Sequence, residues 1–182
     1  MGLIKVLQAS KSRASQPYLK RKVEKAMTQT ASALNIDAQV AIAEALNQSV
    51  AETAVTTMLA QNFHWNVKGM AFGPLHDLFQ QIYEDHFVGQ DDLAERIRAI
   101  DAHAEGMFAG MIKRSKVDEH NGHATDKEMI KMMQDAQETL AATLAGSGEL
   151  AASHGDTLTE DLCIARGQIH EKFAWILRAH LA

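Results

Sequence analysis

The sequence predicts an all-α chain built as a four-helix bundle. Three observations support this prediction: only 2 of the 182 residues are proline, good helix formers such as Ala, Leu, Met, Gln and Glu are abundant, and four long stretches repeat apolar residues at three- and four-residue steps. A chain of this length is large enough to bury a sizeable core. Four amphipathic helices joined by short turns and one longer link are typical of a four-helix bundle.

The first helix is expected at about residues 36–67. Asn35 or Asp37 is suited to cap its beginning, and Gly69 is suited to end it. The apolar positions that recur at helical spacing are Val40, Ala43, Leu46, Val50, Ala54 and Met58.

The second helix is expected to open at Gly73-Pro74, because proline favours the first helical turn. Its apolar positions are Leu75, Leu78, Phe79, Ile82, Phe87, Leu93, Ile97 and Ile100. A less regular link follows at about residues 103–124. We expect this link to hold a short helix near residues 106–113.

The third helix is expected to begin near Thr125, because residues 125–128 read Thr-Asp-Lys-Glu and have the pattern of a capping box. Its apolar positions are Met129, Met132, Met133, Ala136, Leu140 and Leu144, and we interpret the methionines as core filler. Gly155 separates it from a fourth helix at about residues 156–181. The apolar positions there are Leu158, Leu162, Ala165, Ile169, Phe173 and Ile176, and Cys163 nearby is expected to be buried and inert.

Charge is unevenly distributed along the chain. Residues 1–25 carry one acid, Glu24, and seven basic side chains: Lys5, Lys11, Arg13, Lys20, Arg21, Lys22 and Lys25. Their net charge is +6, which leaves −11 for the rest of a chain whose formal net charge is −5. We interpret residues 1–30 as a basic flexible tail and residues 31–182 as the bundle. Such a tail favours contact with DNA phosphates, weakened by salt, whereas a solvated leader or an amphipathic targeting peptide is the alternative.

Membrane spans and disulfides are not expected. The single cysteine, Cys163, has no partner within the chain, and no apolar run approaches the roughly 20 residues that cross a bilayer. A free thiol without a secretory signal predicts a cytoplasmic protein, associated with the nucleoid if it binds DNA.

Two histidines and two acids are the candidate metal ligands. His64 ends the first predicted helix and His76 lies near the start of the second, whereas Asp91 and Glu95 are four residues apart and share a helix face. Imidazole and carboxylate groups together suit iron and similar cations. Solvated surface acids and structural histidines are the alternative interpretation.

The spacing separates these acids from His76 within one chain. His76 and Asp91 are 15 residues apart, which is about 22 Å along a continuous helix. One ion therefore cannot bind both from the same helix. If they share a metal, the acids come from another subunit with an antiparallel helix, and a twofold axis then creates two equivalent sites per dimer.

The run from His64 to Arg96 resembles the signature of the Dps family of small ferritin-like proteins. The shared motifs are His64-Trp65-Asn66, Gly69, Phe72, Leu75-His76 and Asp91 to Arg96, and residues 170–178 are similar to the family's last helix. The resemblance covers about residues 35–181. It implies a ferritin-like bundle, a homododecamer with iron sites at twofold interfaces, oxidation of Fe(II) preferably by hydrogen peroxide, and storage of the ferric mineral.

The resemblance also implies residue roles. The implied iron ligands are His64 and His76 from one subunit with Asp91 and Glu95 from its mate. Glu95 is expected to bridge, and Trp65 either lies beside the iron as a site of oxidation or packs in the core. The family usually has an acid four residues after the second histidine, where this chain has Gln80. We therefore expect two iron positions per site, the second of them weak.

Three acids at the start of the fourth predicted helix suit its positive end: Asp156, Glu160 and Asp161. In similar shells this region helps to line acidic pores that admit cations.

Our leading hypothesis is a ferroxidase that consumes Fe(II) and peroxide, stores iron and protects DNA under stress. The alternative is a DNA-compacting protein with a weak or vestigial iron site. A general ferritin using dioxygen is disfavoured, because ordinary ferritins place their ligands in the middle of one subunit's bundle.

Overall fold

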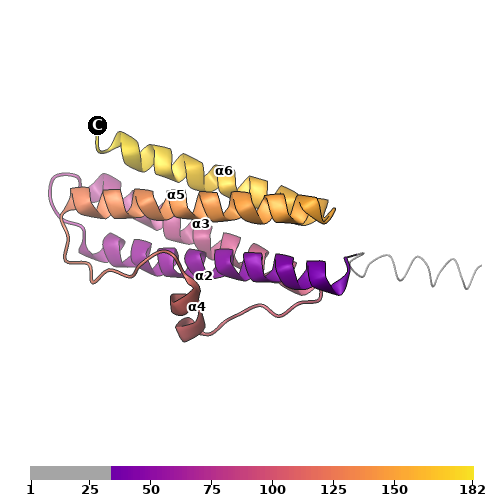
Figure 1. The fold of residues 1–182 in the computed structure, drawn as a ribbon. Helices are drawn as coiled ribbons and strands as arrows, with labels where there is room; N and C mark the ends of the chain where they lie inside the picture. Colours follow the sequence, from indigo (N-terminus) through magenta and orange to yellow (C-terminus); the bar gives the residue numbers. More distant parts are fainter. Residues whose placement is uncertain (1–33) are drawn as a thin grey trace, which may run out of the picture. The chain divides into compact units, whose positions relative to one another are not determined.

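The computed structural model describes residues 34–182, and the predicted tail, residues 1–30, lies outside this part. All regular secondary structure in the described part is helical (Figure 1). The helices are α2 (Ile36–Asn66), α3 (Phe72–Ala99), α4 (Phe108–Arg114), α5 (Asp126–Ser153) and α6 (Thr157–Ala179). The predicted four-helix bundle with a short extra helix between the second and third long helices is confirmed.

The long helices pack as two connected pairs. Helix α2 packs against α3 and α5, and α6 packs against α5 and α3. The short helix α4 lies within the link between α3 and α5 and contacts α2 on the outside of the bundle (Figure 1). This arrangement leaves one face of α2 to be covered by α4 and the link.

Side-chain caps fix the predicted starts of α2 and α5, as well as the start of α6 described below. The Asn35 Oδ1 accepts a hydrogen bond from the backbone N of Ala38 at 2.8 Å, which selects Asn35 over Asp37 as the cap of α2. Thr125 and Glu128 form the predicted capping box at the start of α5. These ends depend on local hydrogen bonds, which is why the sequence locates them well.

Helix α3 begins slightly earlier than predicted. It starts at Phe72, before Gly73-Pro74, and has no side-chain cap. The turn that leads into it contains Gly69 at a φ of +100°, a conformation that L side chains rarely adopt. This tight turn brings the end of α2 and the start of α3 side by side.

The core consists of two apolar clusters with a polar layer between them. The cluster at the α2–α3 turn includes Phe63, Leu75, Phe79, Ile82, Met129, Met133 and Leu177. The cluster at the opposite end includes Ile42, Leu46, Val50, Leu93, Ile97, Leu144 and Cys163. Buried polar residues occupy the middle, among them Thr53, Thr56, His86, Gln137 and His170. The core role predicted for the methionines is confirmed at Met129 and Met133.

Five residues of the predicted apolar stripes are exposed, so their predicted burial is wrong: Val40, Met58, Phe87, Leu158 and Ala165. Polar residues take their place in the core, since Ser49, Thr53 and Thr56 are fully buried. Their hydroxyl groups bond the backbone carbonyl four residues earlier, which satisfies them without a partner helix. Apolar spacing alone therefore did not identify the face of α2 that enters the core.

Gln137 connects three helices in the polar layer. Its Oε1 accepts a hydrogen bond from His170 Nδ1 at 2.8 Å and lies 3.3 Å from His86 Nε2. Burial lowers the pKa of His86 to about 4 and holds the pKa of His170 well below its usual range. Arg166 lies beside them, paired with Asp85 at 2.6 Å. Both imidazoles are therefore neutral at pH 7.

Two further predictions concern membranes and Cys163. Among the described residues, no helix is long and apolar enough to cross a bilayer. Cys163 is buried as expected, and burial raises the pKa of its thiol to about 11. A thiol that stays protonated is a poor nucleophile, in agreement with the inert role predicted for it.

Candidate metal centre

The turn between α2 and α3 brings His64 and His76 face to face. Their ring centroids are 3.6 Å apart, and the ring planes differ by 18°. The Nδ1 of His64 hydrogen-bonds the backbone carbonyl of His76, and the Nδ1 of His76 hydrogen-bonds the backbone carbonyl of His64, both at 2.8 Å. This reciprocal pair of bonds fixes both rings relative to the helix ends.

The hydrogen bonds also determine which nitrogen carries the proton. A carbonyl oxygen only accepts hydrogen bonds, so each Nδ1 of His64 and His76 is protonated. In the neutral form of each ring, Nε2 then keeps its lone pair, and no described residue hydrogen-bonds either Nε2. A neutral imidazole held at Nδ1 by a carbonyl group is the usual form of a metal-binding histidine. The pair is chemically suited to bind a metal.

Aromatic rings flank the histidine pair. Phe72 stacks on His76 with centroids 5.0 Å apart, and Tyr83 meets His64 edge-on at 5.4 Å. Trp65 is 64% exposed, so the alternative that it packs in the core is wrong. The two imidazoles are therefore held from both sides by rings, while the indole next to them faces outward.

Gln80 lies four residues after His76 and shares its face of α3. Its Nε2 donates a hydrogen bond to Oε1 of Glu84 at 2.7 Å. Within the described residues, the Oε1 of Gln80 accepts no hydrogen bond. At position 80 this chain therefore has an amide oxygen, whereas the resemblance to the Dps family predicts a carboxylate.

Asp91 and Glu95 lie far from the histidines within the chain. Helix α3 runs without a break from Phe72 to Ala99, so the spacing of about 22 Å between His76 and Asp91 holds. Both acids are exposed and have no hydrogen bond or ion pair in the described part. In residues 34–182, no three His, Cys, Asp or Glu side chains lie together as a metal site would require. One chain alone does not assemble the predicted ligand set.

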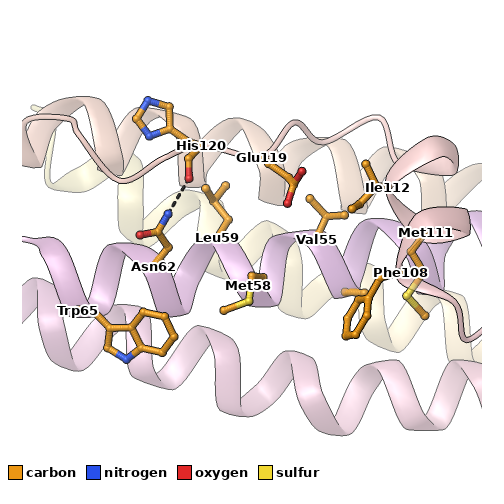
Figure 2. Close-up of a pocket in the computed structure, with 11 residues that line it drawn as sticks. Val55, Met58, Leu59, Asn62, Trp65, Phe108, Met111, Ile112, Glu119 and His120 are labelled. Atoms are coloured by element: carbon orange, nitrogen blue, oxygen red, sulfur yellow. Dashed lines mark hydrogen bonds between the residues drawn. The ribbon is translucent and has the colours of Figure 1, made fainter.

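An apolar groove runs along the side of α2 that faces α4. It lies between α2 and α4, has a volume of about 440 Å³, and includes Trp65, the residue after His64. Figure 2 shows Trp65 and Met58 on α2 and Phe108 on α4 in a row along this groove. Phe108 is 82% exposed. Exposed aromatic and thioether side chains in one patch are typical of a protein–protein contact.

Asp156 has a structural role. It caps α6 by accepting from the backbone N of Thr159, and it forms an ion pair with Arg96 of α3 at 2.7 Å. Its carboxylate is buried, whereas Glu160 is partly buried and Asp161 is exposed. The predicted cap is confirmed. The predicted pore lining then depends on Glu160 and Asp161, because Asp156 is already paired.

The predicted DNA contacts all lie outside the described residues: Lys5, Lys11, Arg13, Lys20, Arg21, Lys22 and Lys25. Their role stays a prediction from sequence charge.

Comparisons with known proteins identify the family of this domain. The model of the ferritin-like domain matches residues 43–182. General stress protein 20U of Bacillus subtilis is 33% identical over 138 residues, which cover 76% of this chain and 95% of that protein. DNA protection during starvation protein 2 of Bacillus anthracis is 32% identical, covering 77% of this chain and 96% of that protein.

Solved structures give the same result. The Dps protein of Vibrio cholerae O1, described as a member of a superfamily of ferritin-like diiron-carboxylate proteins, superposes with a TM-score of 0.80 at 30% identity, covering 84% of this chain and 98% of that one. The Dps protein of Bacillus brevis superposes with a TM-score of 0.79 at 29% identity, covering 82% and 100%.

The fold and the histidine pair identify the chain as a ferritin-like protein, a class that includes diiron-carboxylate proteins. Within this class, the chain belongs to the Dps family of iron-storage and DNA-protection proteins.

Several neighbours of the site were not identified from the sequence. The contact of Tyr83 with His64 was missed, although seven residues separate Tyr83 from His76 and place both on one helix face. The hydrogen bond between Gln80 and Glu84 was not anticipated either, although the two residues are one helical turn apart. No sequence signal paired His170 with Gln137, because that contact joins different helices.

Proposed function

We propose that this protein oxidises Fe(II) with hydrogen peroxide at sites shared by two subunits and stores the ferric product. The observation that carries the proposal is the stacked pair His64 and His76, whose Nε2 lone pairs are unoccupied by any described residue. Carboxylates are needed to hold a ferric product, and the acids Asp91 and Glu95 are about 22 Å away along α3. A second copy supplies them across a twofold axis.

The apolar groove supports this assembly. The site is incomplete in one chain, and the groove exposes Met58, Trp65 and Phe108. A second copy that brings its Asp91 and Glu95 to the histidines also covers this groove. The apolar area removed from water then favours association of the two chains. Six such dimers would make the homododecamer that the resemblance implies.

Each residue then has a defined task. His64 and His76 bind iron through Nε2, Glu95 of the partner bridges the two iron positions, and Asp91 binds iron or orients a histidine. Two Fe(II) ions give one electron each, and one hydrogen peroxide accepts both electrons with two protons to form two waters. Paired one-electron steps at one site avoid release of a hydroxyl radical. Trp65, exposed beside His64, is placed to be oxidised when only one iron is bound.

DNA binding is a second candidate function, favoured by the charge of residues 1–25. Their net charge of +6 on an otherwise acidic chain suits phosphate contacts that weaken as salt rises. Many such segments on one shell would add avidity. A DNA-compacting protein without ferroxidase activity would need this segment and would not need His64 or Glu95.

The proposed function is tested by stopped-flow oxidation of Fe(II) with hydrogen peroxide. We expect fast oxidation by the native protein, loss of the acceleration in His64→Ala and in Glu95→Ala, and no change in the control Glu149→Gln. When the two inactive variants are unfolded and refolded together, about a quarter of the sites combine an intact histidine pair with an intact acid pair. Partial recovery in the mixture supports a shared site, and none contradicts it. No acceleration by the native protein would favour the DNA-compacting alternative.

A further inference from the structure

Gln80 is the point at which the proposed site departs from its family, because an amide stands where a carboxylate is usual. A neutral oxygen is a weaker ligand for an iron cation than a charged one. The structure places one carboxylate in direct contact with this amide. The Oε1 of Glu84 accepts a hydrogen bond from Gln80 Nε2 at 2.7 Å.

This hydrogen bond fixes the orientation of the amide. A carboxylate only accepts hydrogen bonds, so the amide nitrogen of Gln80 must face Glu84. The amide oxygen of Gln80 then points away from this hydrogen bond. That oxygen accepts no hydrogen bond from any described residue. The amide therefore presents an oriented oxygen without a competing donor.

Glu84 is too far along α3 to replace Gln80 as a ligand beside His76. Gln80 lies four residues from His76, about 6 Å along the helix, whereas Glu84 lies eight residues away, about 12 Å. The exposed Glu84 side chain reaches the Gln80 amide and is held there. The contact by which Glu84 can orient a ligand beside His76 is therefore its hydrogen bond to Gln80.

We propose that Glu84 is a positioning residue for the second iron position, acting through Gln80. The inference rests on the proposed function. Glu84 holds the Gln80 oxygen as the ligand, and its negative charge polarises the amide so that this oxygen carries more negative charge. Outer carboxylates that orient a ligand in this way typically contribute 10- to 100-fold to metal affinity. The hydrogen-bonded pair of Gln80 and Glu84 thus restores part of the iron affinity that a carboxylate ligand at position 80 would supply.

The test uses Co(II), which peroxide-free buffer does not oxidise, titrated calorimetrically into the assembled full-length protein. We expect two classes of site in the native protein. Glu84→Ala should weaken the weaker class by about 10- to 100-fold and leave the stronger class unchanged. Glu84→Gln keeps an acceptor for the amide without the charge, so its loss should be smaller. The control Glu149→Gln, an exposed acid on α5, should change nothing.

Two double variants separate action through Gln80 from direct binding. In a Gln80→Ala background, Glu84→Ala should have no further effect on Co(II) affinity. Gln80→Glu combined with Glu84→Ala should recover the weaker class, because a direct carboxylate no longer needs the outer one. An unchanged weaker class in Glu84→Ala, or an equal loss in the Gln80→Ala background, would overturn the inference.

The failure of the proposed function has a different signature. If His64→Ala and Glu95→Ala bind Co(II) as the native protein does, the ion does not bind at the histidine pair, and both proposals are wrong. If those variants lose binding and only Glu84→Ala has no effect, the proposed function stands and the role of Glu84 is refuted.

Discussion

His86 and His170 make the stability of the bundle depend on pH. Burial lowers the pKa of His86 to about 4, from 6.5 in an unfolded chain. Arg166 lowers it further, and Asp85 and Gln137 oppose the shift. For His170, burial is again the main cause, with His86 and Arg166 adding to it. Between pH 6.5 and 4 the unfolded chain binds protons that the folded chain does not, so stability falls as pH falls.

We expect the free energy of unfolding to decrease by up to about 3 kcal/mol between pH 7 and pH 4 from His86 alone, with His170 adding to the decrease. Urea unfolding at fixed protein concentration across this range measures the effect. His86→Gln should flatten the profile, whereas the exposed His154→Gln should leave its slope unchanged. An equally steep profile in both variants would contradict the assignment to His86.

At the scale of elements, Asp156 couples the start of α6 to α3. One carboxylate serves as the helix cap and as the partner of Arg96, while the Nε of Arg96 donates to Thr159 Oγ1 at 2.8 Å. The contact joins the run on α3 that resembles the Dps signature, which ends at Arg96, to the beginning of the last helix. Loss of the acid removes the cap and leaves the largely buried guanidinium of Arg96 without its partner.

Asp156→Ala should therefore lower the free energy of unfolding by about 2–4 kcal/mol, combining a lost cap and a broken, largely buried ion pair. Asp156→Asn retains a capping oxygen and loses the charge, so its effect should be smaller. Chemical unfolding compares both with Asp161→Asn, which removes an exposed acid of the same helix. Equal effects of Asp156→Asn and Asp161→Asn would show that the ion pair does not stabilise the junction.

At the scale of the whole molecule, the exposed apolar groove and the incomplete ligand set are both explained by association with a second copy of the chain. The histidines lie at one end of the α2–α3 pair, and the acids lie toward the other end of α3. Met58, Trp65 and Phe108 are exposed along the groove, and Trp65 directly follows His64 in the chain. A second copy placed on this groove is the proposed source of the acids.

A charge in this groove should disrupt assembly without unfolding the chain. Because Phe108 is 82% exposed, Phe108→Glu should keep the native helical circular dichroism signal. It should lower the oligomeric mass in light scattering and lower the rate of Fe(II) oxidation in parallel. Ala142→Glu, at an exposed position on α5 outside the groove, is the control. Unchanged mass together with lost oxidation would argue that the groove is not the subunit contact.

Local sequence signals predicted most of the helices and their ends. The Asn35 cap, the capping box at Thr125 and the Asp156 cap depend on residues three positions apart, so they can be read from the chain directly. The spacing of His76 and Asp91 likewise predicted that one chain would not assemble the ligand set, and the unbroken α3 bears this out. Burial was predicted less well, as the exposed Val40 and Phe87 show.

The all-α class, the order of the helices and the residues that could bind a metal follow from the amino-acid sequence, because helix periodicity, caps and ligand chemistry are local properties. Only the tertiary structure showed the stacked His64 and His76 and the proton position on each ring, since those bonds cross from α2 to α3. The same holds for the bridge from His86 to His170 through Gln137, which joins three helices. Contacts between helices depend on how each helix is rotated in the bundle, and that rotation is set by packing of the whole core.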